Sequence, residues 1–180
     1  TSSNRLVATI ADNSINIVGA GSCTISATQA STANYATGII TASLVVSKAT
    51  TSMINFTISE RTFGIAPFTL VPPTSNSNGL ITYTSSNTDV ATIVGNNVTI
   101  VGIGNSTITA VQPSTANFLA GTISTTLGVI RGTPIITNFS GITKTFGDTD
   151  FALVPPTSNS NGLITYTSSN LAVATVLAGV

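Results

Sequence analysis

The chain has 180 residues, with five acidic and five basic side chains and therefore a formal net charge of zero. Charged residues make up 6%, against roughly 25% in ordinary soluble domains, and the five cations are scattered along the sequence. No basic patch can form from them, which argues against nucleic acid as a partner, and no apolar run reaches the ~18 residues of a membrane helix, so we expect no membrane span in this segment.

Residues 1–47 predict four short strands separated by turns. Val7–Ile10 and Ile15–Val18 are the first two, with a turn at Asp12-Asn13 between them. Alternation from Cys23 to Ala27 predicts a half-buried third strand, and Ile40, Ala42, Leu44 and Val46 share one face of a fourth. Cys23 is the only cysteine, which excludes an intrachain disulfide, and we interpret it as a small residue on the inward face of its strand.

Residues 48–130 predict a first strand at Met53–Thr57, with Phe56 inward, and a second carrying Phe68 and Leu70 inward. Pro72-Pro73 breaks that second strand, since proline cannot donate to a ladder. Asn78-Gly79 is typical of a tight hairpin turn. A strand is expected after this turn at Leu80–Ser85, followed by four more at Val90–Val94, Val98–Val101, Ser106–Val111 and Thr122–Val129.

One stretch of the chain occurs twice. Val71–Asn87 returns letter for letter as Val154–Asn170, and 46 of the 83 positions in 2–84 match those in 85–167 at the same offset. A fixed internal period, here the step from Val71 to Val154, predicts a tandem array. We therefore divide the chain into the C-terminal half of a repeat (1–47), one complete repeat (48–130) and the N-terminal half of another (131–180).

Each repeat has about seven predicted strands, turn signals every 8–12 residues and no helical periodicity. This pattern predicts an all-β fold of tandem immunoglobulin-like sandwiches, each with two antiparallel sheets. A short joint containing Pro134 favours a stiff rod over a flexible string. The residues expected to be mostly buried in the complete repeat are Phe68, Leu70, Ile81, Tyr83, Val90, Ile93, Val98, Ile100, Ile108, Ala110, Ile123 and Leu127.

The segment from Ile81 to Asn87, with Val90-Ala91-Thr92-Ile93, Val98–Gly102 and Thr107–Ala110, resembles the bacterial Ig-like group 2 (BIG2) pattern. The resemblance covers every repeat and is specific at Ser-Ser-Asn-x-x-Val-Ala-Thr; Tyr83 and Tyr166 stand where the family usually has Trp. The resemblance implies extracellular modules of adhesins, surface-layer proteins and phage virion proteins. It implies no catalytic residue and no cofactor.

The residue types present offer little catalytic chemistry. There is no histidine, so imidazole catalysis and histidine metal ligation are excluded. No Ser-His, Cys-His or zinc-type spacing exists. Asp148 and Asp150 form the only close carboxylate pair, and we interpret them as a solvated loop in preference to a calcium site. We therefore expect no enzyme, no catalytic, cofactor or metal site, and no cofactor.

These observations predict a stalk or filament of Ig-like domains on a cell surface, extracellular fibre or virion. Its partners would be neighbouring copies or further repeats of the same protein. With so few charges to keep molecules apart, we expect lateral packing in a fibre or lattice, or a glycan coat. Candidate glycosylation sites are the sequons at Asn55, Asn97, Asn105 and Asn138.

The alternative is an adhesin module that binds carbohydrate or protein ligands through its loops. Exposed aromatic side chains in those loops would favour it. We interpret Tyr35, Phe63 and Phe118 as core or corner residues, which favours the spacer.

The two partial repeats allow two interpretations. In one, the tail of each subunit completes the head of the next by strand complementation. In the other, the sequence is a section of a longer continuous chain. Val173–Val176 and Val7–Ile10 have the same repeat phase and would compete for one strand position, which favours the continuous chain. In either case we expect exposed apolar faces and open sheet edges on the 180-residue chain.

Overall fold

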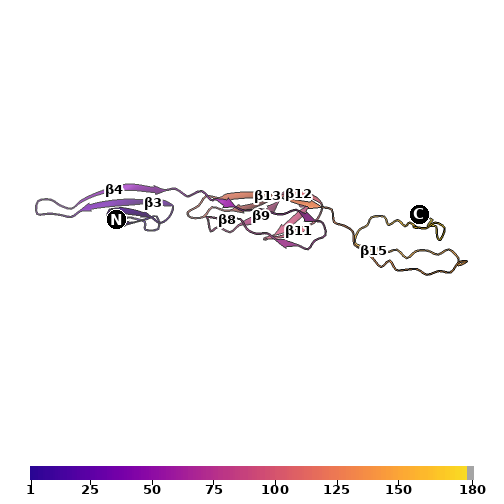
Figure 1. Cartoon of the computed structure of the whole chain (residues 1–180). Coiled ribbons are helices and arrows are strands. Elements are labelled where there is room, and N and C mark those ends of the chain that lie inside the picture. Colours follow the sequence, from indigo (N-terminus) through magenta and orange to yellow (C-terminus); the bar gives the residue numbers. More distant parts are fainter. Residues whose placement is uncertain (178–180) are drawn as a thin grey trace. The chain divides into compact units, whose positions relative to one another are not determined.

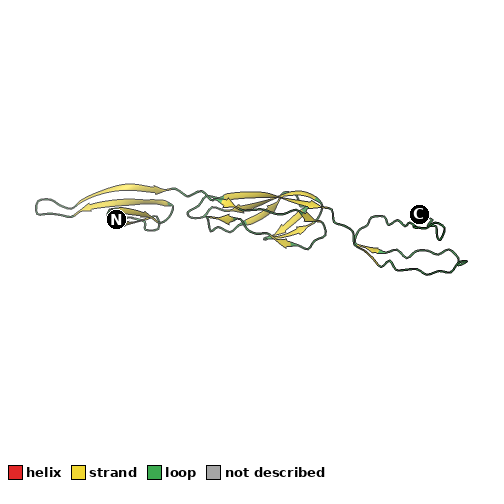
Figure 2. Cartoon of the chain, viewed as in Figure 1, coloured by secondary structure: helices red, strands yellow, loops and turns green. Residues whose placement is uncertain are grey.

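The computed structural model describes residues 1–177 and divides the chain into two compact units, Thr1–Arg131 and the segment that begins at Gly132. All regular structure in the described residues is β-strand, and no helix occurs among them (Figure 1, Figure 2). The prediction of an all-β fold is confirmed.

Residues 1–47 form two antiparallel hairpins. The first pairs β1 (Ala8–Ala11) with β2 (Ser14–Ile17), and the second pairs β3 (Gly21–Gln29) with β4 (Gly38–Val46). Asp12 takes a φ of 51° in the first turn, a conformation that aspartate tolerates better than most residues. Cys23 is buried beside Val7 and Ala8, as its alternation predicted.

Residues 48–130 contain nine strand segments arranged in two main sheets. A four-stranded sheet has the order β6-β13-β12-β9, a three-stranded sheet has the order β10-β11-β7, and β5 pairs with β8. The strands are β5 (Met53–Ile54), β6 (Arg61–Thr62), β7 (Phe68–Thr69), β8 (Thr74–Ser75), β9 (Thr82–Ser85), β10 (Ala91–Val94), β11 (Asn97–Ile100), β12 (Gly104–Gln112) and β13 (Gly121–Ile130).

One apolar core lies between these sheets. All twelve residues predicted for it belong to the observed cluster, and each is buried or half-buried. Leu70, Val98 and Ile108 are among those almost fully removed from solvent. Period-two alternation therefore identified the inward faces correctly, because a strand with one buried face places every second side chain inside.

The strand details differ from the prediction in three ways. There are nine segments where about seven were expected. The four-stranded sheet is not wholly antiparallel, because β6 runs parallel to β13. The first strand stops at Ile54, because Asn55 takes a φ of 61°, which no extended strand accommodates. Phe56 lies inward as predicted.

The predicted hairpin at Asn78-Gly79 is wrong. β8 pairs with β5 and β9 pairs with β12, so the segment between them crosses from one sheet to the other. The physical reason is the buried side chain of Gln112. Its Nε2 donates to the carbonyls of Ser77 (3.2 Å) and Gly79 (2.6 Å), and its Oε1 accepts from the Ser75 hydroxyl. These bonds satisfy the turning backbone without a hairpin ladder.

The unit beginning at Gly132 has one strand pair within its described residues, β14 (Ile136–Thr137) with β15 (Thr157–Ser158). Val173–Val176, expected as a strand, is irregular, because no segment of the described chain pairs with it. An extended segment without a partner strand forms no inter-strand hydrogen bonds. Its backbone groups bond to water, so the extended conformation is not stabilised.

Replacing Gln112 tests the role of this buried side chain. Gln112→Ala removes three hydrogen bonds and leaves two carbonyls and a hydroxyl poorly satisfied, so we expect residues 48–130 to lose about 2–4 kcal/mol of unfolding free energy. Urea denaturation measures the loss. Gln29 has the same repeat phase but is exposed, so Gln29→Ala is the matched control and should change stability by less than ~0.5 kcal/mol. Equal effects at both sites would contradict this account.

Candidate functional site

The strand boundaries recur with the same spacing as the sequence repeat, the spacing between Val71 and Val154. β1, β2 and β3 begin and end one such period before β10, β11 and β12. β14 and β15 lie one period after β5 and β8. Ring geometry recurs as well, since the Phe56–Tyr83 and Phe139–Tyr166 centroids are both 5.8 Å apart. Residues 1–47 and the unit that begins at Gly132 therefore share strand bounds with the matching halves of residues 48–130.

The half formed by residues 1–47 has an open apolar face. Ile25 and Leu44 are only half-buried, although their counterparts Ile108 and Leu127 are fully buried. Ile15 is 48% exposed, where its counterpart Val98 is 0% exposed. The same strand positions that form the core of residues 48–130 thus lie uncovered here.

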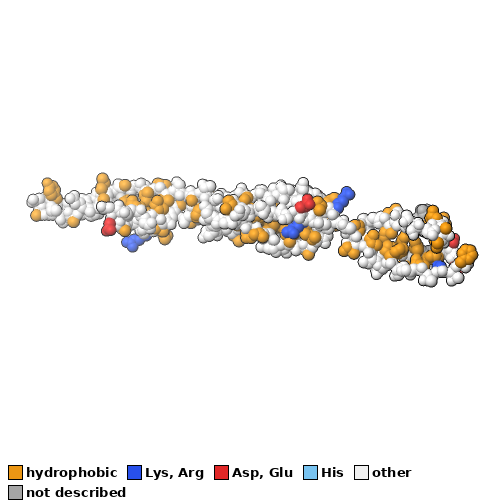
Figure 3. Space-filling model, viewed as in Figure 1, with side chains coloured by type: hydrophobic (Ala, Val, Ile, Leu, Met, Phe, Trp, Pro, Cys, Tyr) orange, Lys and Arg blue, Asp and Glu red, His pale blue; other side chains and the backbone are white. Residues whose placement is uncertain are grey.

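The unit beginning at Gly132 exposes the opposite half of such a core. Phe139 is 55% exposed, whereas its counterpart Phe56 is 5% exposed. Phe151 is exposed and Leu153 is half-buried. In the space-filling view, hydrophobic side chains gather over the visible face of this unit (Figure 3). A contiguous apolar surface of this kind marks an interaction site more often than a solvent face.

A junction joins residues 1–47 to the complete repeat within the first unit. The Ala20 N–H donates to the Asn117 side-chain oxygen at 2.9 Å. A Cβ on Gly19 would lie 2.7 Å from the Leu6 carbonyl oxygen and 2.9 Å from Asn117 Oδ1. Glycine is thus required at this position, because a side chain would collide with the Leu6 carbonyl of the same segment and crowd the Asn117 side chain of the next one.

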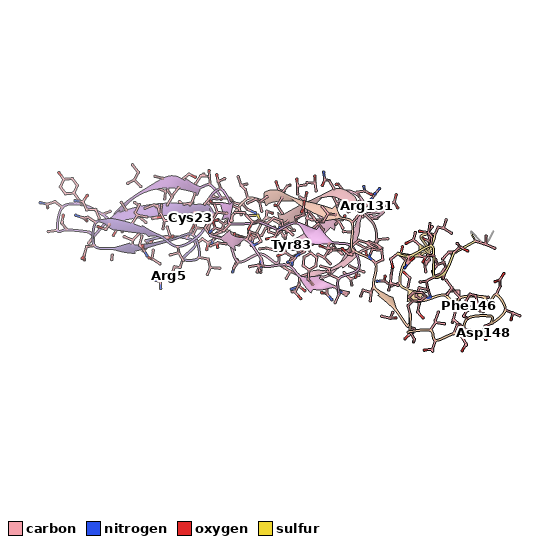
Figure 4. All side chains as sticks on the ribbon, turned by 45° about the vertical axis from the view of Figure 1, so that its right-hand side comes forward. Arg5, Cys23, Tyr83, Arg131, Phe146 and Asp148 are labelled. Atoms are coloured by element: carbon pink, nitrogen blue, oxygen red, sulfur yellow. The ribbon has the colours of Figure 1, made fainter. Side chains whose placement is uncertain are left out.

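The residues singled out for chemistry do not assemble into a reactive centre. No group of three or more His, Cys, Asp or Glu side chains lies together in the part of the chain that the structure describes. The Asp148 carboxylate accepts a hydrogen bond from the Thr145 N–H at 3.0 Å within its own turn. Figure 4 shows Asp148 and Phe146 close together at one end of their unit.

The four sequon asparagines Asn55, Asn97, Asn105 and Asn138 are all exposed. Asn55 and Asn138 share a repeat phase and nearly the same φ, 61° and 60°. Their side chains are therefore accessible to a modifying enzyme, as surface glycosylation requires.

The interpretation of the loop aromatics is wrong for two of three residues. Tyr35 is 78% exposed and Phe63 is 48% exposed. Phe118 is half-buried, because the backbone of Ala49 pairs with that of Phe118 and its neighbours. Tyr35 has the same phase as Phe118, and within the described residues no segment pairs with it as Ala49 pairs with Phe118. Sequence periodicity alone could not predict that Tyr35 is more exposed than Phe118, because the burial of each ring depends on which segment lies beside it.

No protein-family model matches the chain, and no curated protein shows a significant match to it. No helix able to span a membrane is found in residues 1–177.

The Tyr83 hydroxyl gives a pH-dependent test of core burial. Burial raises the pKa of Tyr83 above the usual 10.0, because the phenolate loses hydration. The unfolded chain therefore releases this proton first as pH rises. The stabilising contribution is present below pH 10.0 and is lost as pH rises through the folded-state pKa.

We expect Tyr83→Phe to weaken the loss of stability above pH 10.0, measured as the shift in urea midpoint. Identical profiles for wild type and Tyr83→Phe would show that Tyr83 is not desolvated in the folded chain.

Proposed function

We propose that the protein is a structural spacer, a stalk or filament built from tandem immunoglobulin-like β-sandwiches of BIG2 type and located on a cell surface, extracellular fibre or virion. The observation that carries the proposal is the junction. Asn117 from one repeat accepts a hydrogen bond from the Ala20 backbone of the preceding segment. A side chain that ties one repeat to the next restricts rotation at the joint, which is what a spacer needs to hold its length.

The residues at the junction recur at the same repeat phase elsewhere in the chain. Asn34 stands one period before Asn117, and Gly102 stands one period after Gly19. A Cβ on Gly102 would overlap the Asp89 carbonyl oxygen, so this glycine is also required by its surroundings. The same asparagine is therefore available to form a like contact at each further joint, and each glycine makes room for a carbonyl of its own repeat.

The low charge supports a crowded extracellular setting. Charged residues are 6% of the chain, and exposed apolar side chains recur at Val71 and Val154 and at Leu80 and Leu163. Such a surface has little electrostatic repulsion to keep copies apart. Lateral packing of filaments, or glycans on the exposed sequons, would cover it.

A second candidate is an adhesin module, and the exposed loop aromatics favour it. Tyr35 and Phe63 project from loops of the first unit, and aromatic faces are common carbohydrate and protein contacts. A glycan array and a cell-binding assay separate the two functions. Binding that disappears in Tyr35→Ser or Phe63→Ser would establish the adhesin, whereas the spacer predicts no binding above background for wild type and both variants.

Single-molecule FRET tests the stiffness of the junction at concentrations too low for association. Dyes are attached at Asn13→Cys and Asn96→Cys, two exposed turn positions of equal repeat phase, in a Cys23→Ser background. We expect one narrow efficiency distribution for the parent chain and a broader one for Asn117→Ala. Asn34→Ala is the control, because the Ala20 N–H bonds to Asn117 and not to Asn34. A broad distribution in the parent chain would contradict the spacer.

A further inference from the structure

We propose that two copies of the chain pair side by side through the free edges of β9, with Tyr83 of one copy opposite Tyr83 of the other. Their four-stranded sheets then join into one continuous sheet about a two-fold axis, an isologous contact in which the same surface serves both partners. This inference names the surface through which neighbouring filaments pack, and it rests on the proposed spacer function. It uses only strands of the complete repeat, residues 48–130.

β9 has a free backbone edge. It is the terminal strand of its sheet and pairs only with β12 in the part of the chain that the structure describes. The Ser86 N–H donates to the Thr107 carbonyl at 3.0 Å. Backbone groups in an antiparallel pair alternate in direction along each strand, so every second residue from Ser86 faces β12. The residues between them direct their N–H and C=O groups to the free edge, and these are Ile81, Tyr83 and Ser85.

This edge lacks the features that usually prevent strands from pairing. Exposed edge strands are commonly protected by lysine, proline or a bulge. Leu80–Asn87 contains no charged residue and no proline, and β9 pairs with β12 in continuous register without a bulge. A row of N–H and C=O groups is complementary to itself after a two-fold rotation. No formal charge on this stretch opposes the approach of a second copy.

An open groove of about 680 Å³ lies beside the free edge. Its lining comes from β9, including Tyr83, from the segment ahead of it, including Leu80, and from the turn at Gly95 and Asn96. The Tyr83 ring packs against Phe56 with 5.8 Å between centroids but remains half-buried. Leu80 is 80% exposed. In the paired arrangement the two Tyr83 side chains become cross-strand neighbours on the core side of the joined sheet, a contact that stabilises paired strands.

The internal repeat indicates what covers this groove. Most of its lining lies within Val71–Asn87, the stretch that returns letter for letter as Val154–Asn170. Substitution at exposed positions usually changes stability very little, so the stability of the fold does not explain why exposed Val71 and Leu80 recur unchanged. A contact explains it. A surface repeated at a fixed spacing fits a partner with the same spacing, and a second copy of this chain has that spacing.

The number of backbone hydrogen bonds sets the register between the copies. Pairing Tyr83 with Tyr83, and Ile81 with Ser85, uses every outward backbone group of this edge. A slip of one residue would place outward groups opposite groups already bonded to β12, so the register is well specified. The exposed side chains of Thr82 and Thr84 then face each other between copies on the outer face of the sheet.

Charge exchange at these two positions tests the contact in the full chain. Sedimentation velocity at low salt is measured over a concentration series for wild type, for Thr82→Lys/Thr84→Lys and for Thr82→Glu/Thr84→Glu. We expect reversible association of the wild type, weakened about tenfold or more in each double variant, because like charges meet across the new strand pair. An equimolar mixture of the two variants should associate at least as well as wild type, which also shows that neither variant is misfolded.

A matched pair of variants controls for net charge. Thr122 and Ser124 are exposed and two residues apart on β13, which is separated from β9 by β12. Thr122→Lys/Ser124→Lys and Thr122→Glu/Ser124→Glu carry the same added charge as the β9 variants. Each should associate as wild type does when studied alone, and their mixture should gain nothing.

Disulfide trapping tests the register. Thr82→Cys and Thr84→Cys chains, both with Cys23→Ser, are mixed in oxidised glutathione. Opposite residues of a non-hydrogen-bonded pair have Cα atoms about 4.5 Å apart, within the range that a disulfide spans. We expect a cross-linked dimer that contains one chain of each kind. Thr122→Cys mixed with Thr84→Cys is the control and should form none above background.

The outcomes that overturn the proposal are specific. A wild type that stays monomeric throughout the series would do so, and would leave the edge of β9 to a strand from a different protein. Equal responses of the β9 and β13 variants would show that another surface carries the association. A flexible junction in the FRET measurement would remove the spacer function and leave the β9 pairing intact, so the two failures are distinguishable.

Discussion

The structure depends on one constraint, that an apolar core is built from two halves that are distant in sequence. Val98, Ile108 and Leu127 are fully buried, and they share one core with Phe56 and Leu70 from the earlier half of residues 48–130. The equivalent late strands of residues 1–47 keep their hairpins but leave their apolar face in water. Backbone pairing within a hairpin is therefore insufficient for a core, and burial by the opposite sheet provides most of the favourable free energy.

Polar contacts specify how the halves and repeats are joined. Gln112 holds the crossing segment between the two sheets by satisfying carbonyls that no strand could pair. Asn117 performs a similar role at the junction, where its oxygen accepts the Ala20 N–H. Both side chains bond backbone groups, so they fix the path of the chain without adding charge. A protein with few charged residues can set its geometry in this way, since buried backbone groups require partners.

The sequence predicted the inward faces well and the connections poorly. Alternation around Ile108 and Leu127 is a local pattern, and burial follows from it because successive side chains point to opposite faces. Asn78-Gly79 is a sequence typical of a hairpin turn. The path of this segment is instead determined by Gln112, which is distant from Gly79 in the sequence. Tyr35 looked like a core residue, yet its burial depends on a segment equivalent to Ala49.

The central claim is that coverage by the early strands, more than local sequence, orders the late strands. Amide hydrogen exchange on a dilute, monomeric sample tests it most directly by comparing β3 with β12, which are similar in sequence and have equal lengths. The account predicts that the amides of β12 exchange on the order of 100-fold or more slowly than those of β3, because β12 is paired on both edges and buried. Equal protection of the two strands would contradict it.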